Sequence, residues 1–172
     1  MLSAPRPETE RRVDPSEFFD YGAGRQQDAQ QAAPLFMANL AQEGWTRFLS
    51  VARRRAFEQG EVIVSHGETS REFYIVASGR LEVVAPQRNG SERHVYFVEP
   101  MSIFGEQAFF DGQPRSATVR ALSEGSLFGV TPDAFEVLSA RFPDLTRIAL
   151  FDLGRILSLR LREMTQFALQ GK

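Results

Sequence analysis

The sequence predicts a mainly β domain with flanking helices, in which a sandwich or barrel is followed by a short helix and a long one. Short runs of β-favouring residues, separated by glycine turns, fill the chain from about residue 53 to residue 130. A helical period precedes these runs, and two proline-containing helix starts follow them. Short strands with no helices between them favour antiparallel pairing over a βαβ sheet.

Residues 1–34 form a polar arm with four prolines and a Gln/Ala tract over 26–33. Such a segment cannot bury enough apolar surface to order itself. One island differs, because residues 14–17 read as an N-cap, a proline at the first helical position and an acid three residues after the cap. Three aromatic residues follow within 18–21. This island is a short helix that packs on the protein's own body, a docking peptide for a partner, or a disordered segment.

Apolar residues recur at helical spacing from Leu35 to Ala52 and predict a helix there, with Gly44 as its expected break. The Arg53–Arg55 run is interpreted as a solvated edge that leads into the first strand. Asn-Gly at 89–90, between strand-like flanks, predicts a hairpin. Strands are expected over 62–64, 73–77, 81–85, 95–98, 118–122 and 126–130, with another ending at residue 104.

The tail is predicted to be helical. Thr131 and Pro132 provide a cap and a first helical residue for a helix to Arg141, and Pro143 opens a second helix to Leu169, about 40 Å long. An a/d stripe on this helix predicts a homodimer seam within 143–169. The stripe comprises Leu150, Leu153, Leu157, Leu161, Met164 and Ala168. A second stripe, assigned to the barrel side, comprises Leu145, Ile148, Ile156 and Leu159.

Composition excludes several classes of function. The 172 residues include no cysteine, which excludes disulfides, thiolate metal sites and cysteine nucleophiles. The net charge of −2 does not favour nucleic acid, and no apolar run is long enough to cross a membrane. The N-terminus lacks the apolar region of a secretory signal, so a cytoplasmic protein is expected. His66 and His94 have no clustered carboxylates, and no catalytic motif has usable spacing, so we expect neither a metal nor an enzyme.

The stretch from Ile103 to Val119 carries the most chemistry. Gly105 permits a tight turn, and the residues after it can form one helical turn whose first N–H groups favour an anion. Arg115 follows Glu106 by nine residues and offers a planar fork suited to phosphate. An acid that accepts hydroxyl hydrogen bonds and an arginine that binds phosphate would suit a sugar phosphate. A salt bridge between Glu106 and Arg115 across a surface loop is the alternative.

This stretch resembles the phosphate-binding cassette of the cyclic-nucleotide-binding domain superfamily, which includes catabolite activator proteins and regulatory subunits of cAMP-dependent protein kinase. The matching residues are Phe104-Gly105-Glu106, Ala108 and Pro114-Arg115-Ser116-Ala117-Thr118, with the Glu-to-Arg spacing kept. Turns at Gly60-Glu61, Gly67-Glu68 and Ser78-Gly79-Arg80 are also similar to those of the family. The resemblance covers about residues 35–168.

The resemblance implies an antiparallel eight-stranded jelly roll over about 53–130, helices over 131–141 and 143–169, and a single binding domain over 35–170. It implies a ligand, cAMP or cGMP, whose ribose 2′-hydroxyl is held by Glu106 and whose phosphate is held by Arg115. Backbone amides around Gly105, Ala108 and Ser116 would line the phosphate. The implied ligand-binding set is Gly105, Glu106, Gln107, Ala108, Arg115, Ser116, Ala117 and Arg160.

Two features of the sequence modify what the family implies. The chain stops at Lys172, which leaves no room for a helix-turn-helix, so a protein partner is expected instead of DNA. Arg160 and Leu161 occupy the places where family members have hydroxyl side chains that touch the base. Ser116 is compatible with either nucleotide. The expected function is a stand-alone sensor that signals through its last helix, and the alternative is a degenerate, non-binding interaction module.

Overall fold

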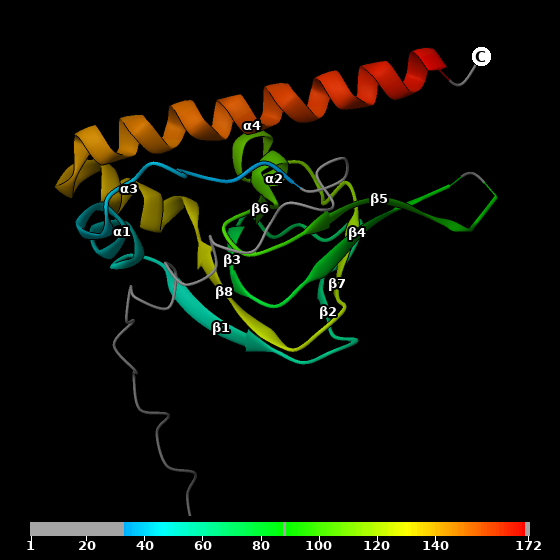
Figure 1. Ribbon diagram of the computed structural model, residues 1–172, viewed down its shortest axis with the longest axis horizontal. Coiled ribbons are helices and arrows are strands. Elements are labelled where there is room, and N and C mark those ends of the chain that lie inside the picture. Colours follow the sequence, from blue (N-terminus) through cyan, green and yellow to red (C-terminus); the bar gives the residue numbers. More distant parts are fainter. Residues whose placement is uncertain (1–32, 88, 171–172) are drawn as a thin grey trace, which may run out of the picture.

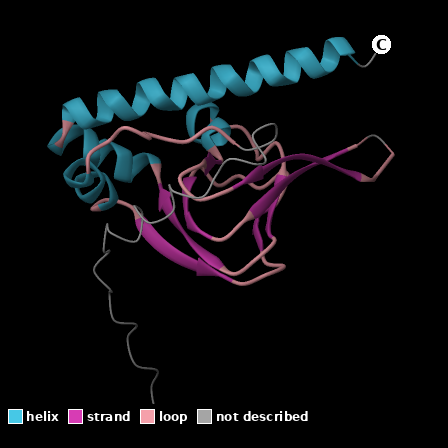
Figure 2. Cartoon of the chain, viewed as in Figure 1, coloured by secondary structure: helices cyan, strands magenta, loops and turns pink. Residues whose placement is uncertain are grey.

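The computed structural model describes residues 33–170 except residue 88, so the arm island over 14–21 lies outside the described residues. Two antiparallel four-stranded sheets form the jelly-roll sandwich, in the orders β1-β8-β3-β6 and β2-β7-β4-β5. Helices gather on one side of this sandwich (Figure 2), and the predicted fold class is confirmed. The strands are β1 (Arg53–Phe57), β2 (Val62–Val64), β3 (Phe73–Ser78), β4 (Leu81–Pro86), β5 (Glu92–Val98), β6 (Ile103–Phe104), β7 (Thr118–Ala121) and β8 (Gly125–Val130).

Strands β4 and β5 form a hairpin that projects from the sandwich (Figure 1). At its turn, Gly90 has a φ of 81°, in the left-handed region that glycine tolerates best. The Gln87 N–H donates to the Ser91 carbonyl, and the Gly90 N–H donates to the Gln87 carbonyl. The Asn-Gly signal therefore located this turn correctly.

Strand β1 is a strand that the apolar pattern did not predict, since the first expected strand began at residue 62. Its three arginines are exposed, and only Phe57 at its end is buried. The strand forms because its backbone pairs with β8 along its whole length, from Arg53 opposite Gly129 to Phe57 opposite Gly125. An edge strand exposed on most of its length carries little hydrophobic signal.

The helix expected from Leu35 to Ala52 is shorter, and α1 spans Gln42–Leu49. The expected break at Gly44 is wrong, because Gly44 lies inside α1. A Cβ at Gly44 would come within 2.7 Å of the Leu40 side chain, so the glycine lets Leu40 pack against the helix. The chain before α1, residues 33–41, is a loop that turns between Met37 and Leu40, and we call it the strap (Figure 1).

The strap crosses between the barrel and the long helix α4 (Pro143–Gln170). Phe36 is fully buried, and its N–H donates to the Met101 carbonyl at 2.8 Å. On the other side, the Met37 N–H donates to Asp152 of α4 at 2.5 Å, and Arg155 donates to the Leu35 carbonyl at 2.6 Å. Asp152 and Arg155 therefore fix the strap to α4.

Helix α3 (Pro132–Arg141) begins as its sequence predicts, because the Thr131 hydroxyl accepts from the Ala134 N–H at 3.1 Å and Pro132 takes the first helical position. Helix α4 presents its buried stripe to the strap, α3 and the barrel. That stripe comprises Leu145, Thr146, Ala149, Leu153, Ile156 and Arg160. Leu153 was assigned to the homodimer seam, which is wrong, since it is fully buried in the core. Ile148 and Leu159 were assigned to the barrel side, which is also wrong, since both are exposed.

Two clusters of buried side chains hold the fold together. One lies between the sheets and includes Phe57, Leu81 and Phe104, and the other joins the outer face of β8, β3 and β6 to α1, α3 and α4. The second is rich in edge-to-face aromatic contacts, such as Phe73 with Phe109 at 4.9 Å between ring centroids. Within residues 33–170 as described, no helix has the length and apolar content to cross a bilayer.

Candidate functional site

The site forms where β6 ends and α2 (Glu106–Asp111) begins, beneath α4 (Figure 1). Gly105 joins the two elements with a φ of 82°, in the left-handed region. A Cβ there would come within 2.5 Å of Arg115 Nη1 and 2.9 Å of the Glu72 carbonyl. Glycine is therefore required twice, by the backbone conformation and by the close approach of Arg115.

Arg115 is buried beside this turn, just before β7. Its Nη1 donates to the Gly105 carbonyl at 3.1 Å, and its Nε and Nη2 donate to the Ser70 hydroxyl at 3.0 and 2.8 Å. These bonds leave one N–H on each terminal nitrogen for a further acceptor. Burial lowers the pKa of Arg115, partly offset by Tyr74 and Glu68, and the guanidinium stays charged. The arginine thus provides a fixed, desolvated cation with a free pair of donors.

Ser70 is held in turn by Glu68. The Ser70 hydroxyl bonds to the Glu68 carboxylate, and this bond is the main cause that lowers the pKa of Glu68. The backbone repeats the link, because the Arg115 N–H donates to the Glu68 carbonyl at 2.8 Å. Glu68 and Ser70 therefore orient Arg115 from the turn that follows β2.

Glu106 opens α2, and its side chain is 2% exposed. Its Oε1 lies 2.5 Å from Nη1 of Arg160, which reaches down from α4 with a side chain 7% exposed. Nη2 of Arg160 donates to the Ile103 carbonyl at 2.7 Å. Glu106 therefore forms its ion pair with Arg160, and the proposed salt bridge between Glu106 and Arg115 is absent from the described contacts.

Arg160 also lies over an aromatic ring, with its guanidinium carbon 4.6 Å from the centroid of Tyr96 on β5. Burial works against its charge, but the Tyr96 hydroxyl and Glu106 outweigh this and raise the pKa of Arg160. Burial raises the pKa of Tyr96 itself to about 12, so the phenol stays neutral. Nη1 of Arg160 is taken up by its ion pair with Glu106, whereas Nε is buried without a hydrogen-bond acceptor among the described atoms. Such a donor is rare in proteins, and an acceptor on a ligand could satisfy it.

The other expected site residues lie around the same turn. Ala108 is buried on α2, and Ala117 packs half-buried against the barrel core. Gln107 and Ser116 are exposed, and the Ser116 hydroxyl donates to Oε1 of Gln107 at 2.7 Å. The structure therefore brings the expected set to one place, with Arg115 and Glu106 on the two sides of Gly105.

Sequence reasoning missed Ser70, Glu68 and Tyr96. Ser70 and Glu68 lie in a turn that the sequence marked only as a turn, by Gly67-Glu68, and Ser70 is 45 residues from Arg115. Tyr96 reads in sequence as an ordinary strand aromatic. Only the tertiary fold, which lays α4 across β5, gives Tyr96 its arginine partner.

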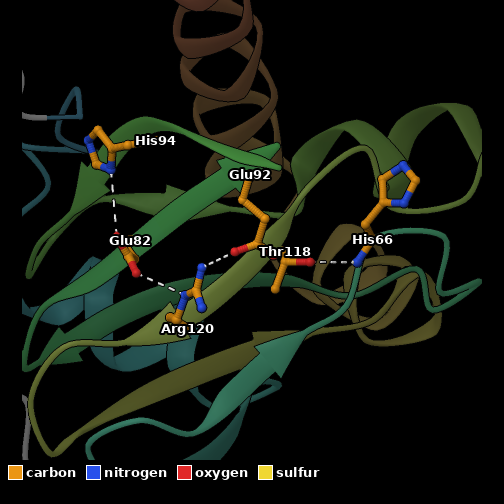
Figure 3. A network of polar contacts seen from close by, with 6 residues as sticks. All are labelled: His66, Glu82, Glu92, His94, Thr118 and Arg120. Carbon is orange, nitrogen blue, oxygen red and sulfur yellow. Dashed lines mark hydrogen bonds and ion pairs between the residues drawn. The ribbon is translucent and has the colours of Figure 1, made fainter. Parts of the chain in front are cut away.

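The two histidines lie apart (Figure 3). His94 belongs to a polar network on the sheet β2-β7-β4-β5, and His66 lies beyond the other end of that network. His94 Nδ1 is 3.7 Å from Glu82, and Arg120 Nε is 2.9 Å from the same carboxylate and also bonds to Glu92. His66 contributes only its backbone N–H, to Thr118. In the described part of the chain, no three potential ligands gather as a metal site would need. This network links β4, β5 and β7.

Gly105→Ala is expected to reduce the free energy of unfolding more than Gly60→Ala does. Both glycines have nearly the same φ, 82° and 83°, so the left-handed backbone costs both variants about 1–2 kcal/mol. Only the Cβ at 105 meets Arg115 and Glu72, whereas nothing lies within 4 Å of one at 60. Overpacking adds about 1–3 kcal/mol at Gly105. Urea denaturation of both variants measures the difference, and equal losses would contradict the close approach of Arg115.

Comparison with known proteins agrees with this geometry. Residues 54–142 match the family model of the cyclic nucleotide-binding domain. The chain is 31% identical to the Cyclic AMP receptor protein of Thermus thermophilus over 77% of its own length and 59% of that protein. It is 32% identical to a cyclic nucleotide-gated potassium channel of Rhizobium etli over 66% of its length and 30% of the channel.

Solved structures give the same result. The catabolite activator protein of Thermus thermophilus superposes with a TM-score of 0.69 at 29% identity, over 76% of this chain and 60% of that one. A cyclic nucleotide-binding domain from Methylobacillus flagellatus has the same fold, with a TM-score of 0.71 at 23% identity over 80% and 77% of the two chains. The chain thus spans less than two thirds of the curated relatives named above. It belongs to the cyclic nucleotide-binding domain family.

Proposed function

We propose that this protein is a non-catalytic sensor of a 3′,5′-cyclic mononucleotide, cAMP or cGMP, and that its α4 helix passes the signal to a protein partner. The observation that carries the proposal is the pair of buried groups on either side of Gly105. Arg115 keeps two free donors, and Glu106 is paired with Arg160 of α4, whose Nε is buried without an acceptor.

Arg115 would bind the cyclic phosphate. A phosphate oxygen pair accepts well from the two N–H groups that Ser70 and Gly105 leave free, since guanidinium and phosphate match in a bidentate geometry. The α2 turn would add backbone N–H groups around Gly105 and Ala108, and the segment before β7 would add that of Ser116. Because Arg115 is already desolvated and oriented, little entropy is lost when the phosphate binds.

Glu106 would accept a hydrogen bond from the ribose 2′-hydroxyl, and Arg160 would donate to an oxygen of the same sugar or phosphate. The unbonded Nε of Arg160 supports this assignment, because a ligand oxygen there would satisfy it. For the base we favour adenine, since the Thermus thermophilus relative is a receptor of cyclic AMP. Ser116, held by Gln107, is the residue that would favour guanine instead.

The signal would reach α4 through Arg160. Its contacts to Glu106, the Ile103 carbonyl and the Tyr96 ring join α4 to the pocket from three elements. A ligand that engages Glu106 and Arg160 together changes how strongly α4 is held. A shift of α4 also reaches the strap, which Asp152 and Arg155 fix to the same helix.

A 2′-deoxy cyclic nucleotide is expected to bind at least about 5-fold more weakly than its ribose parent, because Glu106 is then buried without its donor, at about 1–3 kcal/mol. Competition against a fluorescent cyclic nucleotide measures the difference. Glu106→Gln should weaken ribose binding less than Glu106→Ala, since the amide oxygen still accepts. Equal competition by the two nucleotides would rule out this role of Glu106. Absence of binding by either would favour the non-binding interaction module.

The exposed face of α4 would form a homodimer seam. Leu150, Gly154, Leu157, Leu161 and Met164 alternate at spacings of four and three, as a and d positions do. Leu161 remains 66% exposed, and α4 continues past the barrel (Figure 1). Gly154 takes the place in the seam that was first given to Leu153. A Cβ at Gly154 would meet nothing within 4 Å, so a partner helix can approach closely there.

Leu157→Glu is expected to convert the dimer into a monomer, because it would place a charge in an apolar helix seam. Analytical ultracentrifugation measures the change. The matched control is Leu159→Glu, which adds the same charge on the opposite side of α4, where the side chain is already exposed. A wild-type protein that sediments as a monomer with and without nucleotide would refute the seam, as would dissociation by both variants.

A further inference from the structure

A groove lies between α1 and the corner where α3 meets α4, on the far end of α4 from the pocket residue Arg160. Its volume is about 330 Å³, at the lower end of the range for ligand-sized clefts. Apolar and basic side chains share its wall. The lining includes Gly44, Arg47, Arg141, Phe142, Leu145 and Ile148.

The groove brings two cations against one aromatic ring. The guanidinium carbons of Arg47 and Arg141 lie 5.8 and 5.5 Å from the centroid of the Phe142 ring. Arg47 pairs with Glu43 on its own helix, and the lining acid Asp144 faces Arg147 at 3.7 Å. In the part of the chain that the structure describes, no carboxylate lies within ion-pair distance of Arg141. The groove is therefore suited to a segment that combines aromatic rings with acidic groups.

We propose that residues 14–21 of the N-terminal arm dock into this groove, within the same chain. Their sequence, Asp-Pro-Ser-Glu-Phe-Phe-Asp-Tyr, contains three acids, three aromatic residues and no base. Phe18 and Phe19 occupy the apolar wall by Phe142 and Ile148, and the acids face Arg47 and Arg141. The segment and the groove are thus complementary in charge and in apolar character.

The length of the arm allows this contact. The described chain starts at Ala33, whose carbonyl accepts from Ser102 close to the point where Arg155 holds Leu35. From Arg155 back to Ile148 the axis of α4 rises by about 10 Å. Residues 22–32, which join the segment to Ala33, span up to about 36 Å when extended. The linker therefore reaches the groove with slack, and a short tether of this kind gives an effective concentration of about 1 mM.

Docking in the same chain also connects the arm to α4. The groove includes the first turns of α4, and the strap is bonded to its middle through Asp152 and Arg155. A docked segment would thus fix α3, α4 and α1 relative to one another. The proposal does not depend on the nucleotide pocket, and it can fail while nucleotide binding holds.

A spin label tests the proposal in the full chain. The sequence has no cysteine, so Ser16→Cys gives one attachment site for a nitroxide. The amides of Gly44, Phe142 and Ile148 are expected to broaden in NMR spectra. Replacing Phe18 and Phe19 by alanine in the labelled chain should cut this broadening at least about threefold, because the segment then leaves the groove. Leu2→Ala, an apolar change elsewhere in the arm, is the matched control and should leave it unchanged.

Two further measurements decide whether the segment in the groove comes from the same chain or from a second copy. Arg141→Glu should reduce the broadening, and adding Glu17→Arg should restore it, whereas Arg162→Glu, an equal charge reversal away from the groove, should not change it. A mixture of spin-labelled chain and ¹⁵N-labelled chain without the nitroxide reports docking between copies. Broadening of the ¹⁵N-labelled chain in that mixture would overturn the proposal in favour of a second copy. Broadening that ignores the Phe18 and Phe19 changes would overturn it altogether.

Discussion

Arg115→Ala is expected to weaken binding of a cyclic mononucleotide at least about 30-fold, and isothermal titration calorimetry can measure this. The phosphate would lose its counter-charge in a site from which water is largely excluded, which costs about 2–5 kcal/mol. The loss should be large because the arginine is prepared in advance. Ser70 and the Gly105 carbonyl hold three of its N–H groups, so the two free ones already point in fixed directions.

Arg115→Lys separates charge from geometry. A lysine keeps the charge but cannot make both the Ser70 contacts and a paired phosphate contact, so an intermediate loss is expected. Arg53→Ala removes an exposed arginine from β1 and serves as the control. Unchanged affinity in folded Arg115→Ala protein would show that the phosphate binds elsewhere.

Arg160→Leu is expected to reduce the free energy of unfolding by about 3–5 kcal/mol, because it leaves Glu106 buried without its partner. Chemical denaturation in the absence of nucleotide measures this. Arg155→Leu is a closely matched control. Both arginines lie on α4, and each bonds to one carboxylate and one backbone carbonyl. The Arg155 side chain is 46% exposed, so its loss should cost only about 1 kcal/mol.

The double variant Arg160→Leu with Glu106→Leu removes both buried charges and should regain much of the lost stability. Its recovery would identify the uncompensated carboxylate as the cause. Equal losses from Arg160→Leu and Arg155→Leu would mean that the ion pair beneath α4 has no special weight, and the link from pocket to helix would then lose its physical basis.

The sequence predicted the barrel well because its signals are local. Glycine turns, the Asn-Gly hairpin and the Thr131-Pro132 helix start each depend on a few adjacent residues, and each lies where expected. Strand β1 gave little signal, since its side chains are exposed and its stability comes from backbone pairing with β8. Gly44 was misread as a break because its reason, contact with Leu40, belongs to the strap's tertiary path.

The site, like the fold, combines residues that a local sequence signal predicts with residues that only the tertiary structure brings in. The segment from Gly105 to Arg115 is short enough to recognise in the sequence, and in the fold its two ends meet where Arg115 donates to the Gly105 carbonyl. The groups that orient it come from distant elements, Ser70 from the turn after β2 and Tyr96 from β5. The helical stripes of α4 were separable only in part, because Leu153 and Gly154 are adjacent and only the docked helix decides which of them faces the core.

The central claim is that the pocket below α4 binds a cyclic mononucleotide, and calorimetry of the full chain with cAMP, cGMP and a cyclic dinucleotide tests it most directly. We expect one mononucleotide per chain, with a dissociation constant below about 100 µM. We also expect cAMP to compete with cGMP for the same site and the dinucleotide not to displace either. Absence of binding by both mononucleotides at millimolar concentration, or binding of the dinucleotide alone, would contradict the account.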